Sequence, residues 1–262
     1  MIKGIIFDLD DTLLWDQKSV QVAFENTCKL ATEKYGIDSA EFENAVRDAA
    51  RKLYESYDTY EFTKLIGINP FEGLWGNFLD AHDQFPKMRA NSPTYRKNAW
   101  TLGLKAFGID DPEFGHLLAE TFPEERKGNP FVYDETFDVL DRLNGQYKLL
   151  LLTNGSPDLQ HTKLSITPKI KEYFDQILIS GDFGKGKPDP SIFEHALSLM
   201  ELSKEEVIMV GDNLMTDILG SSRIGMKNVW INRHYKKRNE VVPTYEITHL
   251  EELYPIIDSL NK

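Results

Sequence analysis

Cysteine is nearly missing from this chain, which contains a single one, Cys28. One cysteine excludes a disulfide within the chain, and this agrees with a reducing compartment. No stretch approaches the roughly 18–20 consecutive apolar residues of a membrane-spanning helix. The first apolar run ends in aspartates from Asp8 onward, too early for a secretory signal peptide. We therefore expect a cytoplasmic protein with no membrane partner.

Positive charge is also scarce, with 30 lysines and arginines against 42 aspartates and glutamates, a formal net charge of −12. An acidic protein gains nothing from the counterion release that drives nucleic-acid binding, so we expect no nucleic-acid partner. Any anionic substrate must be attracted by a local positive site. The 6 histidines show no metal-ligand spacing. We interpret the short basic run 236–238 (KKR) as a solvated loop.

The most informative segment is an apolar run that leads directly into acidic residues, GIIFDLDD at residues 4–11. Such a run predicts a buried strand, and open α/β sheets bind ligands where their strands end. Alternate residues of an extended chain point the same way, so Asp8 and Asp10 are expected to converge. Converging carboxylates repel one another unless a cation or a proton relieves them. The pair therefore favours a hard cation such as Mg²⁺, which usually binds together with phosphate.

Further apolar runs predict a parallel sheet. Together with the first run, they cover residues 3–7, 148–153, 176–180, 207–210 and 228–231. Helical patterns over 189–199 and 216–224 lie between the later runs, as in β-α-β units. We predict an α/β fold with a doubly wound parallel sheet and right-handed crossovers.

Residues 16–127 interrupt this alternation of strands and helices. Apolar residues recur at helical spacing over 17–35, 40–65, 71–83 and 113–125, with no convincing strand between them. The segment is far too long for a crossover between neighbouring strands, so it predicts an inserted all-α domain. Hinges are expected at Trp15-Asp16 and Gly128-Asn129-Pro130. The α/β core then consists of residues 1–15 and 128–262.

Polar side chains also follow the later predicted strands, and parallel strands bring such residues to one edge of the sheet. They supply a hydroxyl, an amide, an amine and further carboxylates: Thr153, Asn154, Lys187, Asp212 and Asp217. Taken singly, each has an ordinary interpretation as a turn former, a helix N-cap or a solvated lysine. Their agreement in order and placement is what indicates a catalytic site.

In order and spacing, these clusters resemble the motifs of the haloacid dehalogenase (HAD) superfamily, in its phosphatase branch. The helical insertion after the first cluster resembles the cap domain of one subgroup in position and helical character. The resemblance implies a Rossmann-like core with an all-α cap, and Mg²⁺ as cofactor. It also implies hydrolysis of a small phosphorylated metabolite through an aspartyl-phosphate.

The resemblance assigns catalytic roles to the matched residues. Asp8 is the implied nucleophile, and Asp10 is the implied general acid and then general base. Thr153 and Asn154 are implied to bind the phosphoryl oxygens, and Lys187 to neutralise the negative charge. To act as an acid near neutral pH, Asp10 needs a pKa well above its reference value of about 3.9, which burial or the neighbouring Asp8 must supply.

The resemblance also assigns the metal ligands. Mg²⁺ is implied to bind the carboxylates of Asp8 and Asp212 and the backbone carbonyl of Asp10, while Asp217 orients Lys187 or a metal-bound water. A phosphate dianion repels a carboxylate nucleophile, so cations around Asp8 suit this chemistry independently of the resemblance.

Other functions stay open at this stage. A phosphomutase uses the same residues and differs in how the cap admits water. A dehalogenase needs no metal and replaces the second acid of the first motif, so Asp10 together with Asp212 argues against it. A receiver-type phosphoacceptor domain takes its aspartate from a later strand and lacks the long insertion. Loss of catalysis, leaving a binding protein, has no support in the matched residues.

The substrate also stays open among nucleotides, sugar phosphates, phosphoglycolate and phosphoserine. The Thr-Asn-Gly of residues 153–155 is slightly closer to the nucleotidase and sugar-phosphatase branches. Polar cap residues that could set specificity are Arg89, Tyr95, Arg96 and Lys97. The oligomeric state is not indicated.

Overall fold

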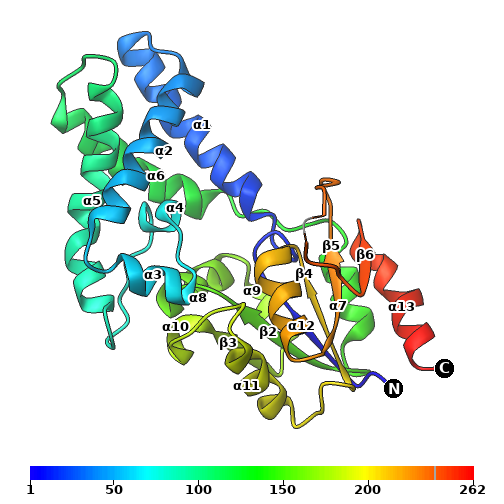
Figure 1. Ribbon diagram of the computed structural model, residues 1–262. Helices are drawn as coiled ribbons and strands as arrows, with labels where there is room; N and C mark the ends of the chain where they lie inside the picture. Colours follow the sequence, from blue (N-terminus) through cyan, green and yellow to red (C-terminus); the bar gives the residue numbers. More distant parts are fainter. Residues whose placement is uncertain (239) are drawn as a thin grey trace. The chain divides into compact units, whose positions relative to one another are not determined.

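The computed structural model describes residues 1–238 and 240–262, which divide into two compact units (Figure 1). Unit 1 consists of Met1–Trp15, Val132–Gly155 and Thr167–Lys262, and unit 2 of Asp16–Phe131 and Ser156–Ile166. The chain therefore passes between the units at both ends of the long insertion and at both ends of the segment Ser156–Ile166. The assignment of residues 16–127 as a cap stays a prediction.

Unit 1 is built on a 6-stranded sheet in the order β3-β2-β1-β4-β5-β6, and every neighbouring pair is parallel. The strands are β1 (Gly4–Phe7), β2 (Lys148–Thr153), β3 (Gln176–Ile179), β4 (Val207–Gly211), β5 (Lys227–Ile231) and β6 (Tyr245–Ile247). The α/β fold with a doubly wound parallel sheet is thus confirmed. Each apolar run forms a strand within about one residue of its expected ends, because buried parallel strands need continuous apolar sequence.

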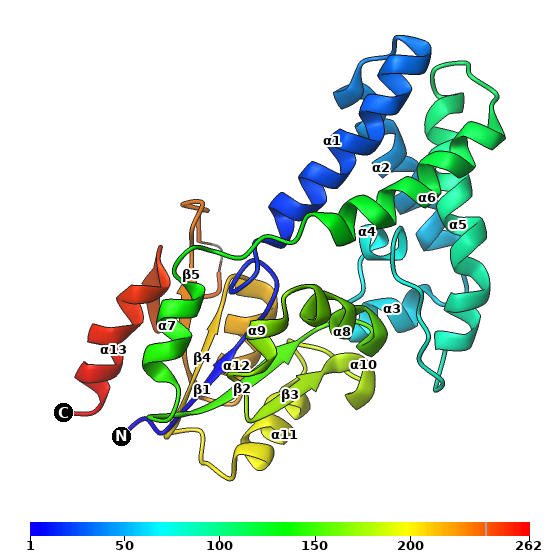
Figure 2. The same cartoon turned by 180° about the vertical axis from the view of Figure 1, so that it is seen from behind.

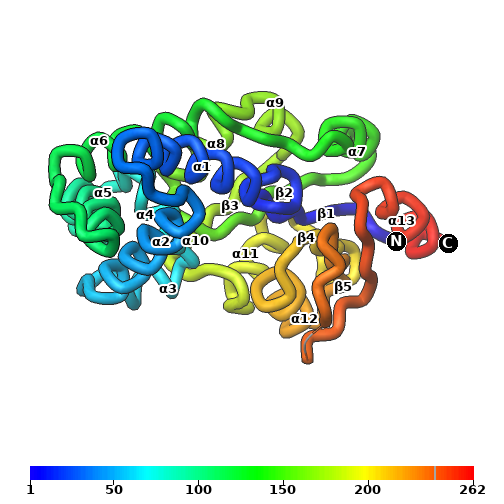
Figure 3. The backbone as a smooth tube through the Cα atoms, turned by 90° about the horizontal axis from the view of Figure 1, so that it is seen from above, coloured from blue at the N-terminus to red at the C-terminus, as the bar shows by residue number. Residues whose placement is uncertain are grey.

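Helices cover both faces of this sheet. Figures 1 and 3 show α11 (Pro190–Met200) and α12 (Leu219–Arg223) on one face, and α7 (Thr136–Leu143) and α9 (Pro168–Lys171) on the other. On the first face, Ile6 and Met209 of the central strands pack in one buried cluster with Phe193 of α11. The remaining helical segments of unit 1 are α10 (Ser180–Phe183), the π-helical turn η1 (Leu214–Ile218), the 3-10 turn η2 (Leu250–Glu252) and α13 (Leu253–Leu260).

Unit 2 is entirely helical in its regular structure. Its elements are α1 (Asp16–Tyr35), α2 (Ser39–Ser56), α3 (Tyr60–Ile66), α4 (Pro70–Gly73), α5 (Phe85–Lys105), α6 (Pro112–Gly128) and α8 (Pro157–Ile166). Figure 2 shows the long helices α1, α2, α5 and α6 packed against one another. Their shared core is aromatic, with Phe24, Phe42, Trp100 and Phe122 fully buried. No helix in the described residues is long and apolar enough to cross a bilayer.

Helix α8 follows β2 of unit 1 in the sequence but packs within unit 2. Leu159 is buried in the aromatic core of that unit. Lys163, with a side chain only 2% exposed, forms an ion pair of 3.0 Å with Glu72 of α4. The carboxylate of Asp80 accepts hydrogen bonds from the Ser156 hydroxyl (2.7 Å) and the Asp158 backbone N–H (3.0 Å), which caps the start of α8. Buried polar contacts therefore fix this helix in the unit.

Two predicted helices of the insertion were wrong in extent. The helix expected over 40–65 is interrupted, because the chain turns extended at Tyr57 and restarts as α3. The helix expected over 71–83 ends at Gly73, and Phe78 and Asp83 beyond it have positive φ angles. Helix α5 was not predicted, since polar residues and Pro93 dilute its apolar pattern. In unit 1, the helix expected over 216–224 is split between η1 and α12.

Candidate active site

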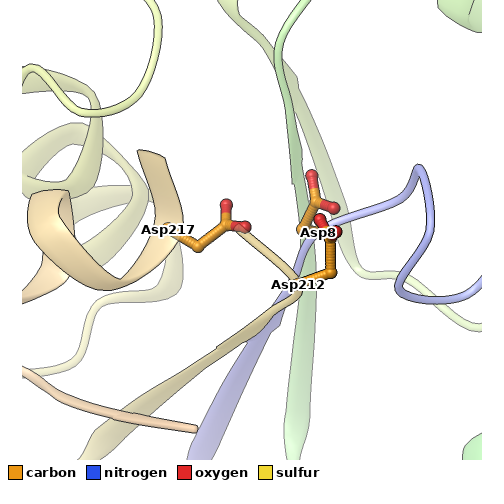
Figure 4. A group of neighbouring side chains, drawn as sticks. All are labelled: Asp8, Asp212 and Asp217. Atoms are coloured by element: carbon orange, nitrogen blue, oxygen red, sulfur yellow. The ribbon is translucent and has the colours of Figure 1, made fainter. Parts of the chain in front are cut away.

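The candidate site lies where β1 and β4, the two central strands, end side by side. Phe7 is paired with Val210 in the parallel register, so Asp8 and Asp212 leave neighbouring strands at the same edge of the sheet. The backbone N–H of Asp8 extends the ladder by donating to the Val210 carbonyl at 3.0 Å. Asp217 follows on η1. Figure 4 shows all three carboxylates directed toward a common point.

The three aspartates form a tight cluster, and a buried lysine contacts two of them. Ligand oxygens of Asp8, Asp212 and Asp217 lie within 4.8 Å of one another. The ammonium of Lys187 is 2.6 Å from Asp8 Oδ1 and 2.7 Å from Asp217 Oδ1, with only 2% of its side chain exposed. It also donates to the carbonyl of Leu152 at 2.8 Å. Lys187 therefore joins β1, β2 and η1, as the parallel arrangement of the strands predicts.

The electrostatics of the cluster show an excess of negative charge. Burial raises the pKa of Asp8 to about 6, although the charge of Lys187 opposes this shift. Burial, together with the negative charge of Asp8, raises the pKa of Asp212 to about 8. Burial alone lowers the pKa of Lys187, but Asp217 and Asp8 more than compensate, so its pKa lies above the usual value and it stays protonated. One ammonium does not balance three carboxylates, and the site is suited to a further cation.

The turn after β1 holds Asp8 from the other side. The Thr12 hydroxyl donates to Asp8 Oδ2 at 3.0 Å, and Thr12 is fully buried. Asp11 has a φ of 60°, which reverses the chain directly after Asp10. Asp10 is half-buried in this turn, two residues after Asp8. The local sequence pattern predicts only a turn or capping role for Thr12. The one sequence feature that could have indicated its contact with Asp8 is its position four residues after that aspartate.

A side-chain amide holds the loop that carries the lysine. Asn154 Oδ1 accepts the backbone N–H of Lys187 at 2.8 Å, and Asn154 Nδ2 donates to the Lys187 carbonyl at 2.9 Å. Gly186 leaves room for this approach, because a Cβ there would lie 2.8 Å from Asn154 Oδ1. Thr153 is buried at the end of β2, next to β1. The structure thus brings Thr153 and Asn154 to the same edge as Asp8, with the Asn154 side chain bound to the Lys187 backbone.

The loop after β4 positions both of its aspartates. The Asn213 backbone N–H donates to Asp217 Oδ2 at 3.1 Å. A Cβ at Gly211 would meet the Asp217 carboxylate at 2.3 Å, so this position needs glycine. The Trp230 indole donates to the Asp212 carbonyl at 2.7 Å. The sequence pattern does not single out Gly211 or Trp230, because the Gly211 approach depends on how η1 turns back on β4 and the Trp230 contact on the pairing of β4 with β5.

The polar residues proposed for specificity lie in unit 2. Tyr95 is buried, and its hydroxyl donates to the Pro70 carbonyl at 2.7 Å. Arg96 donates to a backbone carbonyl and a side-chain amide of the same unit. Arg89 and Lys97 are exposed. Tyr95 and Arg96 therefore have structural contacts of their own, and their role in specificity stays a prediction.

Comparisons with known proteins give consistent matches. Residues 2–225 match the family model of haloacid dehalogenase-like hydrolases. The phosphoserine phosphatase of Thermus thermophilus is 31% identical, over 97% of this chain and 98% of that protein. The pyrimidine 5'-nucleotidase YjjG of Escherichia coli (strain K12) is 34% identical, over 74% of this chain and 93% of that protein. The solved structure of the HAD-hydrolase YfnB from Bacillus subtilis, bound to magnesium, superposes with a TM-score of 0.67 at 24% identity. That match covers 98% of this chain and 99% of the other.

Proposed function

Because the chain belongs to the haloacid dehalogenase-like hydrolase family, we propose that it hydrolyses a small soluble phosphate monoester through an aspartyl-phosphate on Asp8, with Mg²⁺ as cofactor. The family match confirms the resemblance of the sequence motifs. The phosphatase names of the relatives confirm the predicted enzyme class, a phosphoric monoester hydrolase. The observation that carries the finer proposal is the position of Lys187 between Asp8 and Asp217, two of the three clustered aspartates.

The contacts of Asp8 suit a nucleophile. Thr12 and Lys187 each hold one of its carboxylate oxygens, so the side chain is oriented before a substrate arrives. In the first step, an oxygen of Asp8 forms a bond to phosphorus while the ester P–O bond breaks. Asp10 gives its proton to the leaving oxygen. A covalent intermediate divides one difficult displacement into two easier ones.

The second step returns the enzyme to its starting state. Asp10, now a carboxylate, takes a proton from water while the water oxygen bonds to phosphorus. The bond between phosphorus and Asp8 breaks, which releases inorganic phosphate and frees the nucleophile. Lys187 stays protonated throughout, because its pKa is raised by the charges of Asp217 and Asp8 against the effect of burial. Its ammonium therefore stabilises negative charge on the phosphoryl group in both steps.

The donor set of the site fits Mg²⁺, which takes oxygen ligands. We assign the Asp8 and Asp212 carboxylates and the Asp10 backbone carbonyl as its protein ligands. Asp217, like Asp8, forms an ion pair with Lys187. We therefore assign Asp217 to holding that ammonium in place and not to binding the cation. When bound, the cation supplies positive charge that reduces repulsion between the nucleophile and the phosphoryl group.

The relatives' names span different phosphate esters, an amino-acid phosphate in one case and a nucleotide in another. We therefore propose a small phosphorylated metabolite of the cytoplasm as the substrate class. A panel that includes phosphoserine and pyrimidine nucleoside monophosphates is the direct way to identify it, with kcat/KM for each compound as the measurement.

Hydrolysis of p-nitrophenyl phosphate tests the mechanism. Turnover is expected to require Mg²⁺ and to fall by about 10³-fold or more in Asp8→Asn, since the nucleophile is lost. Asp258→Asn, an exposed change on α13, is the matched control and is expected to keep wild-type activity. Asp10→Asn is expected to accumulate a hydroxylamine-sensitive phosphoryl adduct on Asp8, visible by mass spectrometry. Turnover that survives Asp8→Asn or chelation would contradict the proposal. Phosphorylation of wild-type Asp8 without turnover would favour a phosphoacceptor domain.

A further inference from the structure

The loop after β5 brings a second lysine to the aspartate cluster. Lys236 is the first residue of the basic run that the sequence pattern placed in a solvated loop. Its ammonium lies 3.6 Å from Asp212 Oδ2, with the Lys236 side chain 49% exposed and that of Asp212 18% exposed. The next residue, Lys237, is exposed, and Arg238 forms an ion pair with Glu246. Within the run, Lys236 is thus the residue directed to the candidate site.

A buried amide fixes the backbone of Lys236. Asn232 is only 4% exposed, and its Oδ1 accepts the Lys236 backbone N–H at 2.7 Å. Its Nδ2 donates to the Lys236 carbonyl at 3.0 Å and to Glu246 Oε1 at 2.7 Å. Asn154 holds both backbone groups of Lys187 in the same way. Because one amide satisfies the donor and the acceptor of the same residue, each lysine starts from a defined backbone position.

The other cation of this loop has a different partner. Arg233 donates to Glu135 Oε1 at 2.6 Å and to the Thr12 carbonyl at 3.1 Å. Its positive charge is therefore balanced by Glu135. Arg233 and Lys236 both line a small pocket with Asp11 and Asp212, and it is Lys236 whose ammonium lies 3.6 Å from Asp212 Oδ2. Lys236 is thus the cation of the 232–236 loop that acts on the charge of Asp212.

We propose that Lys236 is a positioning residue that holds the Asp212 carboxylate and weakens divalent-cation binding at the site. This inference rests on the proposed function, in which Asp212 is a metal ligand. An ammonium beside Asp212 competes for its oxygens and repels a bound dication. At a separation of about 5 Å in water-like surroundings with partial salt screening, the repulsion corresponds to roughly a fivefold change in affinity.

The chain contains a reporter for this test. Trp230 is 1% exposed, and its indole bonds to the Asp212 backbone carbonyl, so its fluorescence is expected to respond to a ligand of Asp212. Mg²⁺ is titrated into metal-free protein, with isothermal titration calorimetry as a second measurement. Lys236→Met is expected to lower the Mg²⁺ Kd about fivefold, while Lys236→Arg stays within twofold of wild type. Lys237→Met is the matched control, because it removes the same charge one residue further on.

The salt dependence and a variant of the proposed metal ligand Asp212 separate the proposal about Lys236 from the proposal of a metal site. The effect of Lys236→Met is expected to shrink as salt is raised, which a loss of structure would not produce. Asp212→Asn is expected to abolish the Mg²⁺ response. If that variant still binds Mg²⁺, the proposed metal site itself is refuted. A different result refutes only the role of Lys236. In that case Asp212→Asn abolishes Mg²⁺ binding, but Lys236→Met has the same Mg²⁺ affinity as Lys237→Met, or a lower affinity than wild type.

Discussion

Replacement of Asp212 by asparagine is expected to stabilise the metal-free protein while removing a proposed metal ligand. Burial and the charge of Asp8 raise the pKa of Asp212 from 3.8 to about 8. An acid whose pKa is raised by folding makes its full stabilising contribution to the folded protein at pH values below its pKa in the unfolded chain. That contribution is lost as the pH rises through the folded pKa. Between about pH 4 and pH 8, the metal-free protein therefore becomes progressively less stable because of Asp212, whereas asparagine does not titrate.

The magnitude follows from the same shift. One pKa unit corresponds to about 1.36 kcal/mol, so a shift from 3.8 to about 8 sets an upper limit of about 6 kcal/mol at high pH. The Asp212 side chain is 18% exposed, so water relieves part of this cost. We expect a gain of about 2 kcal/mol at pH 8. For a protein of this size, this corresponds to a rise in Tm of about 4–8 °C.

Thermal unfolding in the presence of a chelator at pH 5 and pH 8 measures this effect. The difference in Tm between Asp212→Asn and wild type is expected to grow from pH 5 to pH 8, while Asp258→Asn on α13 follows wild type at both. Saturating Mg²⁺ is expected to stabilise wild type, by about 2.7 kcal/mol at 100 times the Kd, and to leave Asp212→Asn unchanged. An Asp212→Asn protein that unfolds below wild type at pH 8 with chelator would refute the electrostatic reasoning.

Two further buried ion pairs predict a loss of stability when one partner is replaced. Lys187→Met leaves two buried carboxylates without their ammonium, so we expect a loss of about 3–5 kcal/mol in urea unfolding at pH 7. In unit 2, Arg126 is 2.6 Å from Asp16, and although burial raises the pKa of Asp16, Lys163 and Arg126 bring it below its usual value of 3.8. This stabilisation is present above pH 3.8 and lost as the pH falls through the lowered pKa, so Asp16→Asn is expected to reduce Tm by several degrees at pH 7 and progressively less toward pH 3.

The sheet could be predicted from the sequence because its central strands are buried on both faces and therefore continuously apolar. Asp8 and Asp212 directly follow such strands, and neighbouring parallel strands end at one edge of the sheet. The proximity of the two aspartates could therefore be predicted without coordinates. Strand β6 was missed because it has three residues, Tyr245–Ile247, of which only Ile247 is buried. A short edge strand has no apolar run to mark it.

Contacts between side chains and distant backbone could not be predicted in this way. The space that Gly211 leaves for Asp217 depends on how η1 turns back on β4, and the contact of Lys236 with Asp212 depends on β5 lying beside β4. Neither has a local pattern, since the same residues occur widely in turns and solvated loops. A basic run next to a strand therefore gives no indication of which of its lysines enters a site.

The two lysines of the site differ in burial, and this difference assigns them different tasks. Lys187 is 2% exposed between two carboxylates, so its removal leaves buried charges that water cannot reach. Lys236 is 49% exposed beside one carboxylate, so water can replace its ammonium at little cost. Asn154 and Asn232 anchor both lysines by equivalent backbone bonds, yet only the exposed one can exchange with a cation at Asp212. Lys187→Met should therefore alter folding stability, and Lys236→Met should alter metal affinity with folding stability preserved.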